Sequence, residues 1–174
     1  MARFDKGPIL VTGASGGIGG ATVRQLCEAG ADVIASGRNK EALKLLSQDT
    51  GCRTLVFDLE DEESICEALD GVDLYGVVNC GGFGGEIATP METDISIFDK
   101  VMTINARGAL LVTKYASQSM LRLGKGGVIV NVSSQASLVG LKGHISYGSS
   151  KAALDNITRV SALELGQYGI RVNS

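Results

Sequence analysis

The chain has 174 residues, of which 44% are hydrophobic, and this length and composition suit one domain with a packed core. Its formal net charge of −3 is not gathered into a strong block of either sign, which argues against a nucleic-acid partner. The four cysteines lack the spacing of metal ligands and His144 is the single histidine, so we expect no metal site. No leader-like N-terminal segment and no apolar run of membrane-spanning length is present, so we expect a cytoplasmic protein without a membrane partner.

Strand-like and helix-like segments alternate along the whole chain. Strands are expected at residues 8–12, 31–36, 53–59, 72–80, 126–134 and 169–174. Helices are expected at residues 17–29, 39–48, 61–69, about 93–104, about 108–122 and about 147–166, with Asp61 as an N-cap. This order predicts an α/β fold, a doubly wound parallel sheet with helices on both faces, in a single domain over residues 1–174.

The first expected strand leads into a helix through "TGASGGIGG", residues 12–20. Its glycines Gly13, Gly17 and Gly19 follow a G-x-x-x-G-x-G pattern. Small residues let the backbone approach a pyrophosphate, and the helix N-terminus offers free N–H groups and a positive dipole end. A glycine-rich turn without a ligand is the alternative, but the strand-to-helix context favours phosphate binding.

The end of the second expected strand should distinguish NAD from NADP. An acidic residue there would bind a ribose 2′-hydroxyl, whereas an arginine would favour a 2′-phosphate. The sequence has Ser36 and Gly37 where the acid would stand, and Arg38 follows them. A solvated loop cation is the alternative for Arg38, but the missing acid predicts NADP(H) as the cofactor.

Tyr147 and Lys151 are four residues apart at the start of the last expected helix, so their side chains share one helix face. A nearby ammonium stabilises phenolate and lowers the pKa of a tyrosine, which suits a proton donor in carbonyl reduction. A chance pair on a solvated helix face is the alternative.

Ser134 ends the fifth expected strand, where open α/β sheets bind ligands, and its hydroxyl could bind a substrate oxygen. Ser133 would point to the other face if the strand persists, and a plain turn serine is the alternative for Ser134.

These motifs resemble those of the short-chain dehydrogenase/reductase family. "TGASGGIG" resembles its cofactor loop, "NCGG" at residues 79–82 stands where the family has N-N-A-G, and "NVSS" precedes "YGSSK", the family's Y-x-x-x-K. They occur in the family's order over nearly the whole chain. The region from "IVNVSSQAS" to "SALELGQYGIRVNS" is similar to the L-xylulose (dicarbonyl) reductase branch and related carbonyl reductases, and 3-oxoacyl reductases are similar there too.

The resemblance implies a Rossmann-type fold and assigns a role to each site residue. The implied catalytic residues are Asn105, Ser134, Tyr147 and Lys151. The implied cofactor-binding residues are Gly13, Ser15, Gly17, Ile18, Gly19, Arg38, Asp58, Leu59, Asn79, Tyr147 and Lys151. The implied substrate-binding residues are Ser134, Gln135, His144 and Tyr147.

Several of these roles have an ordinary structural alternative. Asp58 would contact the adenine, and Lys151 would also hold the nicotinamide ribose. Asn79 would lie beside the cofactor and brace the neighbouring strand, or it is a simple strand-end residue. Asn105 would bend its helix and hold a water linked to Lys151, or it is a cap between two helices. His144 would contact a polar substrate at the pocket rim, or it is an exposed loop residue.

The resemblance also implies the activity and the assembly. We expect an NADP-dependent oxidoreductase that reduces a small ketone or dicarbonyl, such as an L-xylulose-like sugar, and that forms a homo-oligomer, a dimer or a tetramer. Family members continue beyond "RVNS" through a P-G turn, a substrate loop and a seventh strand, so we expect a C-terminally truncated chain with an open sheet edge. A non-catalytic product that binds only a nucleotide or a related subunit is the alternative.

Overall fold

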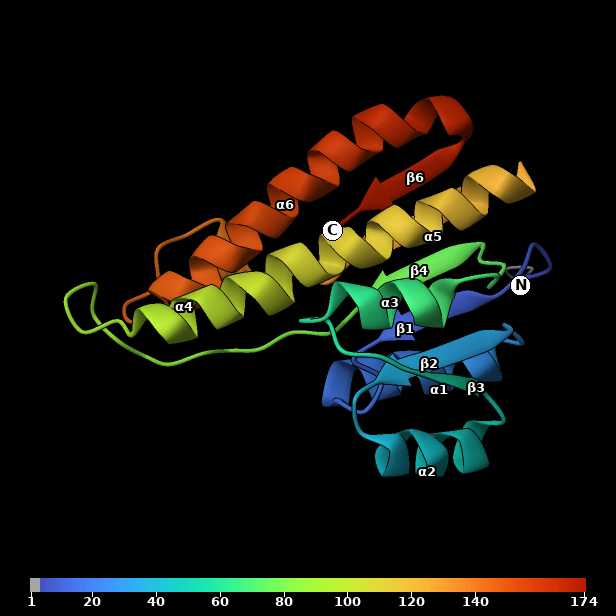
Figure 1. The fold of residues 1–174 in the computed structure, drawn as a ribbon, viewed down its shortest axis with the longest axis horizontal. Coiled ribbons are helices and arrows are strands. Elements are labelled where there is room, and N and C mark those ends of the chain that lie inside the picture. The colour runs from blue at the N-terminus through green and yellow to red at the C-terminus, as the bar shows by residue number, and fades with distance from the viewer. Residues whose placement is uncertain (1–3) are drawn as a thin grey trace.

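The computed structural model describes residues 4–174, and within them a parallel sheet of six strands has the order β3-β2-β1-β4-β5-β6 (Figure 1). The strands are β1 (Ile9–Thr12), β2 (Val33–Gly37), β3 (Arg53–Val56), β4 (Gly76–Asn79), β5 (Gly127–Asn131) and β6 (Ile170–Asn173). The α-helices are α1 (Gly17–Glu28), α2 (Lys40–Thr50), α3 (Glu62–Leu69), α4 (Ile95–Met102), α5 (Ala109–Leu123) and α6 (Ile145–Leu165). The predicted fold class, a Rossmann-type doubly wound parallel sheet with helices on both faces, is confirmed.

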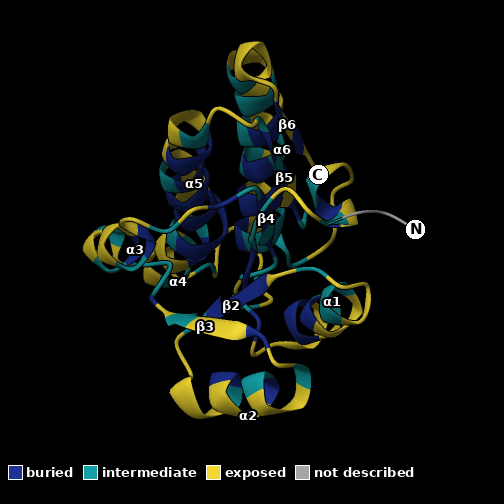
Figure 2. Ribbon diagram, turned by 90° about the vertical axis from the view of Figure 1, so that its right-hand side faces the viewer, coloured by how far each residue is buried: buried dark blue, intermediate teal, exposed yellow. Residues whose placement is uncertain are grey.

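Two cores lie on opposite faces of the sheet because successive strand residues point to opposite sides. Along β1, Leu10 joins the core between the sheet and the helices α3 and α5, whereas Val11 joins the core under α1 and α2. In β2, Ile34 belongs to the first core and Val33 to the second. Figure 2 shows the buried sides of the helices turned toward the strands and their exposed sides turned outward.

The predicted N-cap of α3 is confirmed. The Asp61 carboxylate accepts hydrogen bonds from the backbone N–H groups of Glu63 at 3.0 Å and Ser64 at 3.3 Å. Asn39 caps α2 in the same way, and α2 ends at Gly51 in the left-handed conformation, with φ of 73°. Side-chain caps and a left-handed glycine thus set helix ends that hydrophobic periodicity alone places loosely.

Three predicted strands are too long. The expected strand 53–59 ends at Val56. The expected strand 72–80 begins only at Gly76, because Tyr75 and Gly76 both donate their backbone N–H to the Pro8 carbonyl, at 2.9 and 3.1 Å, as the chain enters the sheet. The expected strand 126–134 ends at Asn131. Beyond it Ser134 caps a 3₁₀ turn, η2 (Gln135–Ser137), so the expectation that the strand persists through Ser133 and ends at Ser134 is wrong.

The two helices expected at 93–104 and 108–122 are not separated by a break. A π-helical turn, η1 (Thr103–Gly108), joins α4 directly to α5, and Asn105 lies inside it. The interpretation of Asn105 as a cap between two helices is therefore wrong. A π turn widens the helix by one residue and is frequent at functional sites.

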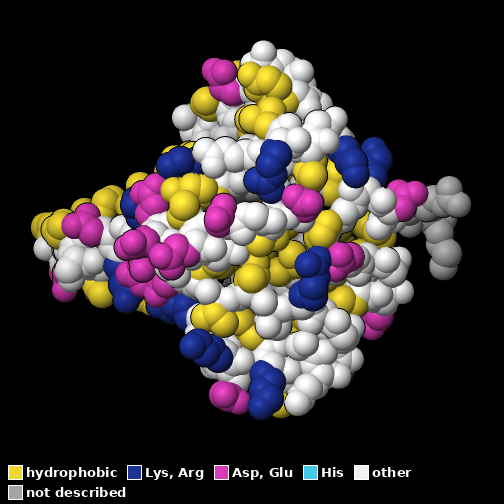
Figure 3. Space-filling model, turned by 45° about the vertical axis from the view of Figure 1, so that its right-hand side comes forward, with side chains coloured by type: hydrophobic (Ala, Val, Ile, Leu, Met, Phe, Trp, Pro, Cys, Tyr) yellow, Lys and Arg dark blue, Asp and Glu magenta, His cyan; other side chains and the backbone are white. Residues whose placement is uncertain are grey.

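On the face drawn in Figure 3, acidic and basic side chains of the described residues lie interspersed, with hydrophobic side chains between them. None of the helices in residues 4–174 has both the length and the apolar character needed to cross a membrane. The carboxyl ends of β1 and β4 meet where the strand order reverses, and open α/β sheets bind their ligands in such a crevice.

A matched pair of leucines in α2 tests the packing of the second core. Leu43 is 1% exposed and packs against that core, whereas Leu45 on the same helix is 65% exposed. Leu43→Ala should lower the free energy of unfolding by about 2–5 kcal/mol because it leaves a cavity. Leu45→Ala should change it by less than about 0.5 kcal/mol, and urea denaturation measures both. Equal effects of the two substitutions would contradict this assignment of the core.

Candidate active site

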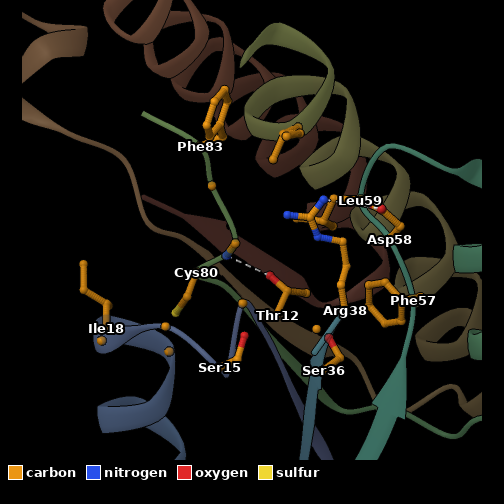
Figure 4. A pocket seen from close by; sticks show the side chains of 18 residues that line it. Thr12, Ser15, Ile18, Ser36, Arg38, Phe57, Asp58, Leu59, Cys80 and Phe83 are labelled. Carbon is orange, nitrogen blue, oxygen red and sulfur yellow. Dashed lines mark hydrogen bonds and ion pairs between the residues drawn. The ribbon is translucent and has the colours of Figure 1, made fainter. Parts of the chain in front are cut away.

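A cavity of about 360 Å³ opens at the carboxyl ends of the strands, between the glycine loop and the segment after β4 (Figure 4). Many residues predicted to hold the cofactor line it. They are Gly13, Ser15, Gly17, Ile18, Gly19, Arg38, Asp58 and Leu59. The other three, Asn79, Tyr147 and Lys151, lie outside its lining.

The glycine loop is shaped by two close backbone contacts. Gly13 has φ of 63°, and a Cβ there would lie 2.6 Å from the Cα of Gly81. A Cβ at Gly19 would collide with the Gly13 carbonyl oxygen. A Cβ at Gly17 would meet nothing within 4 Å and would point into open space. Gly13 and Gly19 are thus needed for the fold of the loop, whereas Gly17 leaves room on the side of the cavity.

The lining fits a dinucleotide. Gly20 makes the first helical hydrogen bond of α1, to the Gly16 carbonyl, so the earlier amides of this helix have no helical partners. Such amides bind phosphate well. Ser36 lines the same cavity, is 0% exposed, and within the described residues its hydroxyl has no hydrogen-bond partner. A polar ligand group is what these donors lack.

Arg38 lies along the wall of the cavity next to Asp58 and Leu59 (Figure 4). Its Nη1 atom is 3.6 Å from an Asp58 carboxylate oxygen and 3.4 Å from a Glu60 carboxylate oxygen. The interpretation of Arg38 as a plain solvated cation is therefore incomplete, because two acids hold it at the cavity.

Asn79 braces the sheet. Its amide donates to the Asn131 side chain in β5 at 2.8 Å, and the Asn131 amide donates in turn to Thr158 in α6 at 2.8 Å. Asn79 is 3% exposed, so its side chain is occupied in tying β4 to β5. Asn79 itself does not line the cavity, but the next residue, Cys80, does.

The Lys151 ammonium lies 5.7 Å from the centre of the Tyr147 ring and donates to the Val132 carbonyl at 2.8 Å. Lys151 is 5% exposed, and burial lowers the pKa of its ammonium, an effect that the negative charge of Asp155 partly offsets. A Cβ at Gly82, which lines the cavity, would lie 3.8 Å from the Lys151 ammonium. The pair therefore sits directly behind one wall of the cavity and not on a solvated helix face.

Ser134 and Tyr147 lie on segments that touch each other. Ser134 is the N-cap of η2 and accepts the Ala136 N–H at 3.2 Å, and a Cβ at Gly148 would lie 3.0 Å from the Ala136 carbonyl oxygen. The first turn of α6 thus packs on η2 without an intervening side chain. Ser133 immediately precedes this N-cap, and its hydroxyl is buried with no hydrogen-bond partner among residues 4–174.

Asn105 ties three segments together. Its side chain accepts the Phe83 N–H at 2.7 Å and donates to the Phe83 carbonyl at 2.9 Å. It also donates to the Ser150 hydroxyl at 2.9 Å, and Ser150 donates to the Tyr147 carbonyl at 2.7 Å. The π turn places this amide between the loop after β4 and the helix that carries the Tyr147–Lys151 pair.

The remaining predicted substrate residues lie farther out. His144 is the N-cap residue of α6, and its ring Nδ1 is 2.9 Å from the Lys142 carbonyl. It lines a second, open hollow of about 600 Å³ together with Leu141. Gln135 is exposed at the start of η2. The structure therefore places His144 and Gln135 on segments next to Tyr147 but not in the cavity that Arg38 lines.

Sequence reasoning missed several residues of the site. Ser150 and Glu60 acquire their roles from partners distant in sequence, although Ser150 could have been found as the residue one turn after Tyr147. Thr12 accepts the Gly81 N–H at 3.1 Å and so joins β1 to the loop after β4. Burial raises the pKa of the Cys80 thiol, so it faces the cavity as a neutral group.

Gly17 and Gly19 give a test that separates the loop's fold from its ligand. Gly19→Ala should lower both thermal stability and the affinity for a nicotinamide dinucleotide, because the added methyl group meets the Gly13 carbonyl. Gly17→Ala should weaken binding of a nicotinamide dinucleotide at least about tenfold with an unchanged melting temperature, because its methyl group enters open space on the side of the cavity. Calorimetry of binding and of unfolding checks both. Unchanged affinity in Gly17→Ala would contradict phosphate binding at this loop.

The buried Lys151 predicts a pH dependence of stability. Because its pKa is lower in the folded protein than in the unfolded chain, the unfolded chain binds the proton more tightly. The stability of the wild type relative to Lys151→Met should therefore rise with pH from the lowered pKa up to the ordinary value of about 10.4. Urea denaturation at several pH values measures it, with Lys125→Met at an exposed site as control. A difference that stays constant with pH would refute this burial effect.

Comparisons with known proteins agree with this geometry. The family model described as short chain dehydrogenase matches residues 8–174. An L-xylulose reductase of Bos taurus is 39% identical over 166 residues, which span 95% of this chain and 68% of that protein. Carbonyl reductase (NADPH) 2 of Sus scrofa is 37% identical with the same two coverages. The structure of an NAD⁺-bound xylitol dehydrogenase superposes with a TM-score of 0.92 at 33% identity, over 99% of this chain and 70% of that one. The chain therefore belongs to the short-chain dehydrogenase/reductase family, as an oxidoreductase that resembles L-xylulose reductase.

Proposed function

We propose that the protein is an NADP-dependent reductase of small ketones and dicarbonyls, including L-xylulose-like sugars. The observation that carries this proposal is the buried Lys151 ammonium, 5.7 Å from the Tyr147 ring and behind the wall of a glycine-lined cavity. The names of the relatives, which are sugar and carbonyl reductases, support the substrate class. For NADP the support is Arg38 at the cavity, in a strand end without an acidic residue.

Tyr147 is the proposed acid. Reduction of a ketone leaves negative charge on its oxygen, and the Tyr147 hydroxyl would give that oxygen a proton. The Lys151 ammonium stabilises the phenolate that remains. Because the Val132 carbonyl holds this ammonium at 2.8 Å, Lys151 stays in place as the tyrosine changes charge.

Ser134 is proposed to bind the substrate oxygen. Its oxygen accepts the Ala136 N–H, which leaves the hydroxyl proton available to donate to a carbonyl. That hydrogen bond strengthens as charge develops on the oxygen. Asn105 is the proposed fourth member, and it acts by fixing Ser150 and the loop at Phe83.

A bound nicotinamide dinucleotide would supply the hydride. The residues proposed to hold it are those of the glycine loop together with Arg38, Asp58, Leu59 and Asn79, and, at the nicotinamide end, Tyr147 and Lys151. His144 and Gln135 are proposed to contact the rest of the substrate.

We also propose a homo-oligomer, which the exposed apolar side chains of Leu110 in α5 and Leu163 in α6 support. The cytoplasmic location stays a prediction.

Tyr147→Phe tests the mechanism. The purified protein should oxidise NADPH when L-xylulose or a small dicarbonyl is added, and the substitution should lower kcat at least about a hundredfold because the proton donor is lost. The dissociation constant for NADPH should change less than about twofold. Tyr168→Phe at a tyrosine that is 51% exposed is the control and should keep the wild-type rate. Full activity of Tyr147→Phe would remove the proton-donor role.

A further inference from the structure

Four charged side chains meet at the coenzyme end of the cavity. Arg38 pairs with Asp58 and Glu60, and one Glu60 carboxylate oxygen also lies 3.8 Å from the Lys100 ammonium. Lys100 in turn lies 5.7 Å from the centre of the Phe83 ring, which lines the cavity. Two cations and two carboxylates therefore form a cluster whose formal charges cancel.

The two carboxylates are held differently. Asp58 follows β3 and lines the cavity, and one of its oxygens also accepts the Glu60 backbone N–H at 3.0 Å. Glu60 lies outside the cavity lining, and a single oxygen of its carboxylate serves both Arg38 and Lys100. Glu60 is thus the group that neutralises the cations at the cavity without itself facing a ligand.

We infer that Glu60 is a determinant of coenzyme selectivity that lowers the affinity for NADPH by occupying Arg38. The inference rests on the proposed use of NADP and deepens it. A 2′-phosphate carries nearly two negative charges at neutral pH and would enter a cluster with no net positive charge. NADPH must therefore draw Arg38 away from Glu60, whereas NADH, which has no 2′-phosphate, has no such cost.

The solvent exposure of the Arg38–Glu60 pair sets the expected size of its effect on NADPH affinity. The Arg38 side chain is 63% exposed and that of Glu60 30%, so water and salt screen the pair. Partly exposed pairs of this kind change binding modestly, and we expect Glu60→Gln to tighten NADPH roughly three- to tenfold. The substitution keeps the side-chain size and leaves Arg38 and Lys100 against Asp58 alone, a cluster with one net positive charge.

The experiment measures dissociation constants of NADPH and NADH by fluorescence titration for five proteins. They are the wild type, Glu60→Gln, Arg38→Ala, the double variant of these two, and Glu63→Gln. Glu63 is an exposed acid near Glu60 that forms no ion pair within the described residues, so its variant removes the same charge away from Arg38. Thermal unfolding of each protein shows that the fold is retained.

Glu60→Gln should tighten NADPH and leave NADH within about twofold, and Glu63→Gln should leave both unchanged. The gain should disappear in the Arg38→Ala background, because Glu60 acts through Arg38. It should also shrink at high ionic strength. A Glu60→Gln variant with unchanged or weaker NADPH binding would overturn the inference, as would a gain that survives without Arg38.

A wrong assignment of NADP as the coenzyme would give a different set of dissociation constants. If Arg38→Ala binds NADPH as the wild type does, Arg38 does not meet the 2′-phosphate, and both the coenzyme assignment and the role of Glu60 are overturned. If Arg38→Ala loses NADPH affinity while Glu60→Gln behaves as the wild type, only the role of Glu60 is overturned.

Discussion

The close approach of two backbone segments at the point where the strand order reverses fixes the rest of the site. Gly13 after β1 and Gly81 after β4 are so near that a side chain at Gly13 would meet the Gly81 backbone at 2.6 Å. Thr12 adds a hydrogen bond to the Gly81 N–H. Because β1 and β4 are neighbours in a parallel sheet, their carboxyl ends must both turn here, and only small residues let them do so without parting.

One short segment, residues 81–83, connects this backbone contact to the Tyr147–Lys151 pair. Residues 81–83 form the cavity wall, and behind this wall Gly82 faces Asn105 and the Lys151 ammonium. Asn105 holds Phe83 by both backbone groups, so the segment is anchored at its two ends. The glycine loop and the Tyr147–Lys151 pair, 130 residues apart in sequence, thus share one wall, and a shift of this wall would disturb both.

Local patterns in the sequence predict much of this arrangement. The glycine loop and the Tyr147–Lys151 pair depend on spacing within one turn or helix, and the alternation of strands and helices predicts the sheet. Local periodicity does not predict the π turn at Asn105, whose side chain bonds to Phe83, 22 residues away in sequence. The expectation of a strand over 72–75 was wrong because this segment bonds to α5 and not to a neighbouring strand. The Ser119 hydroxyl donates to the Val72 carbonyl at 2.8 Å and accepts the Leu74 N–H at 3.0 Å. The pairing of Arg38 with Glu60 likewise depends on tertiary structure, which no short sequence window contains.

The two ends of the site handle charge in opposite ways. At the proposed coenzyme end, four half-exposed groups balance one another, and water and salt weaken each interaction. At the proposed proton-transfer end a single ammonium is buried, with a carbonyl as its hydrogen-bond partner, and burial keeps its field strong at Tyr147. Ionic strength should therefore alter coenzyme binding far more than proton transfer. The proposed coenzyme site needs reversible binding of a ligand that leaves after each turnover, whereas the proposed proton donor needs a neighbouring charge that stays in place.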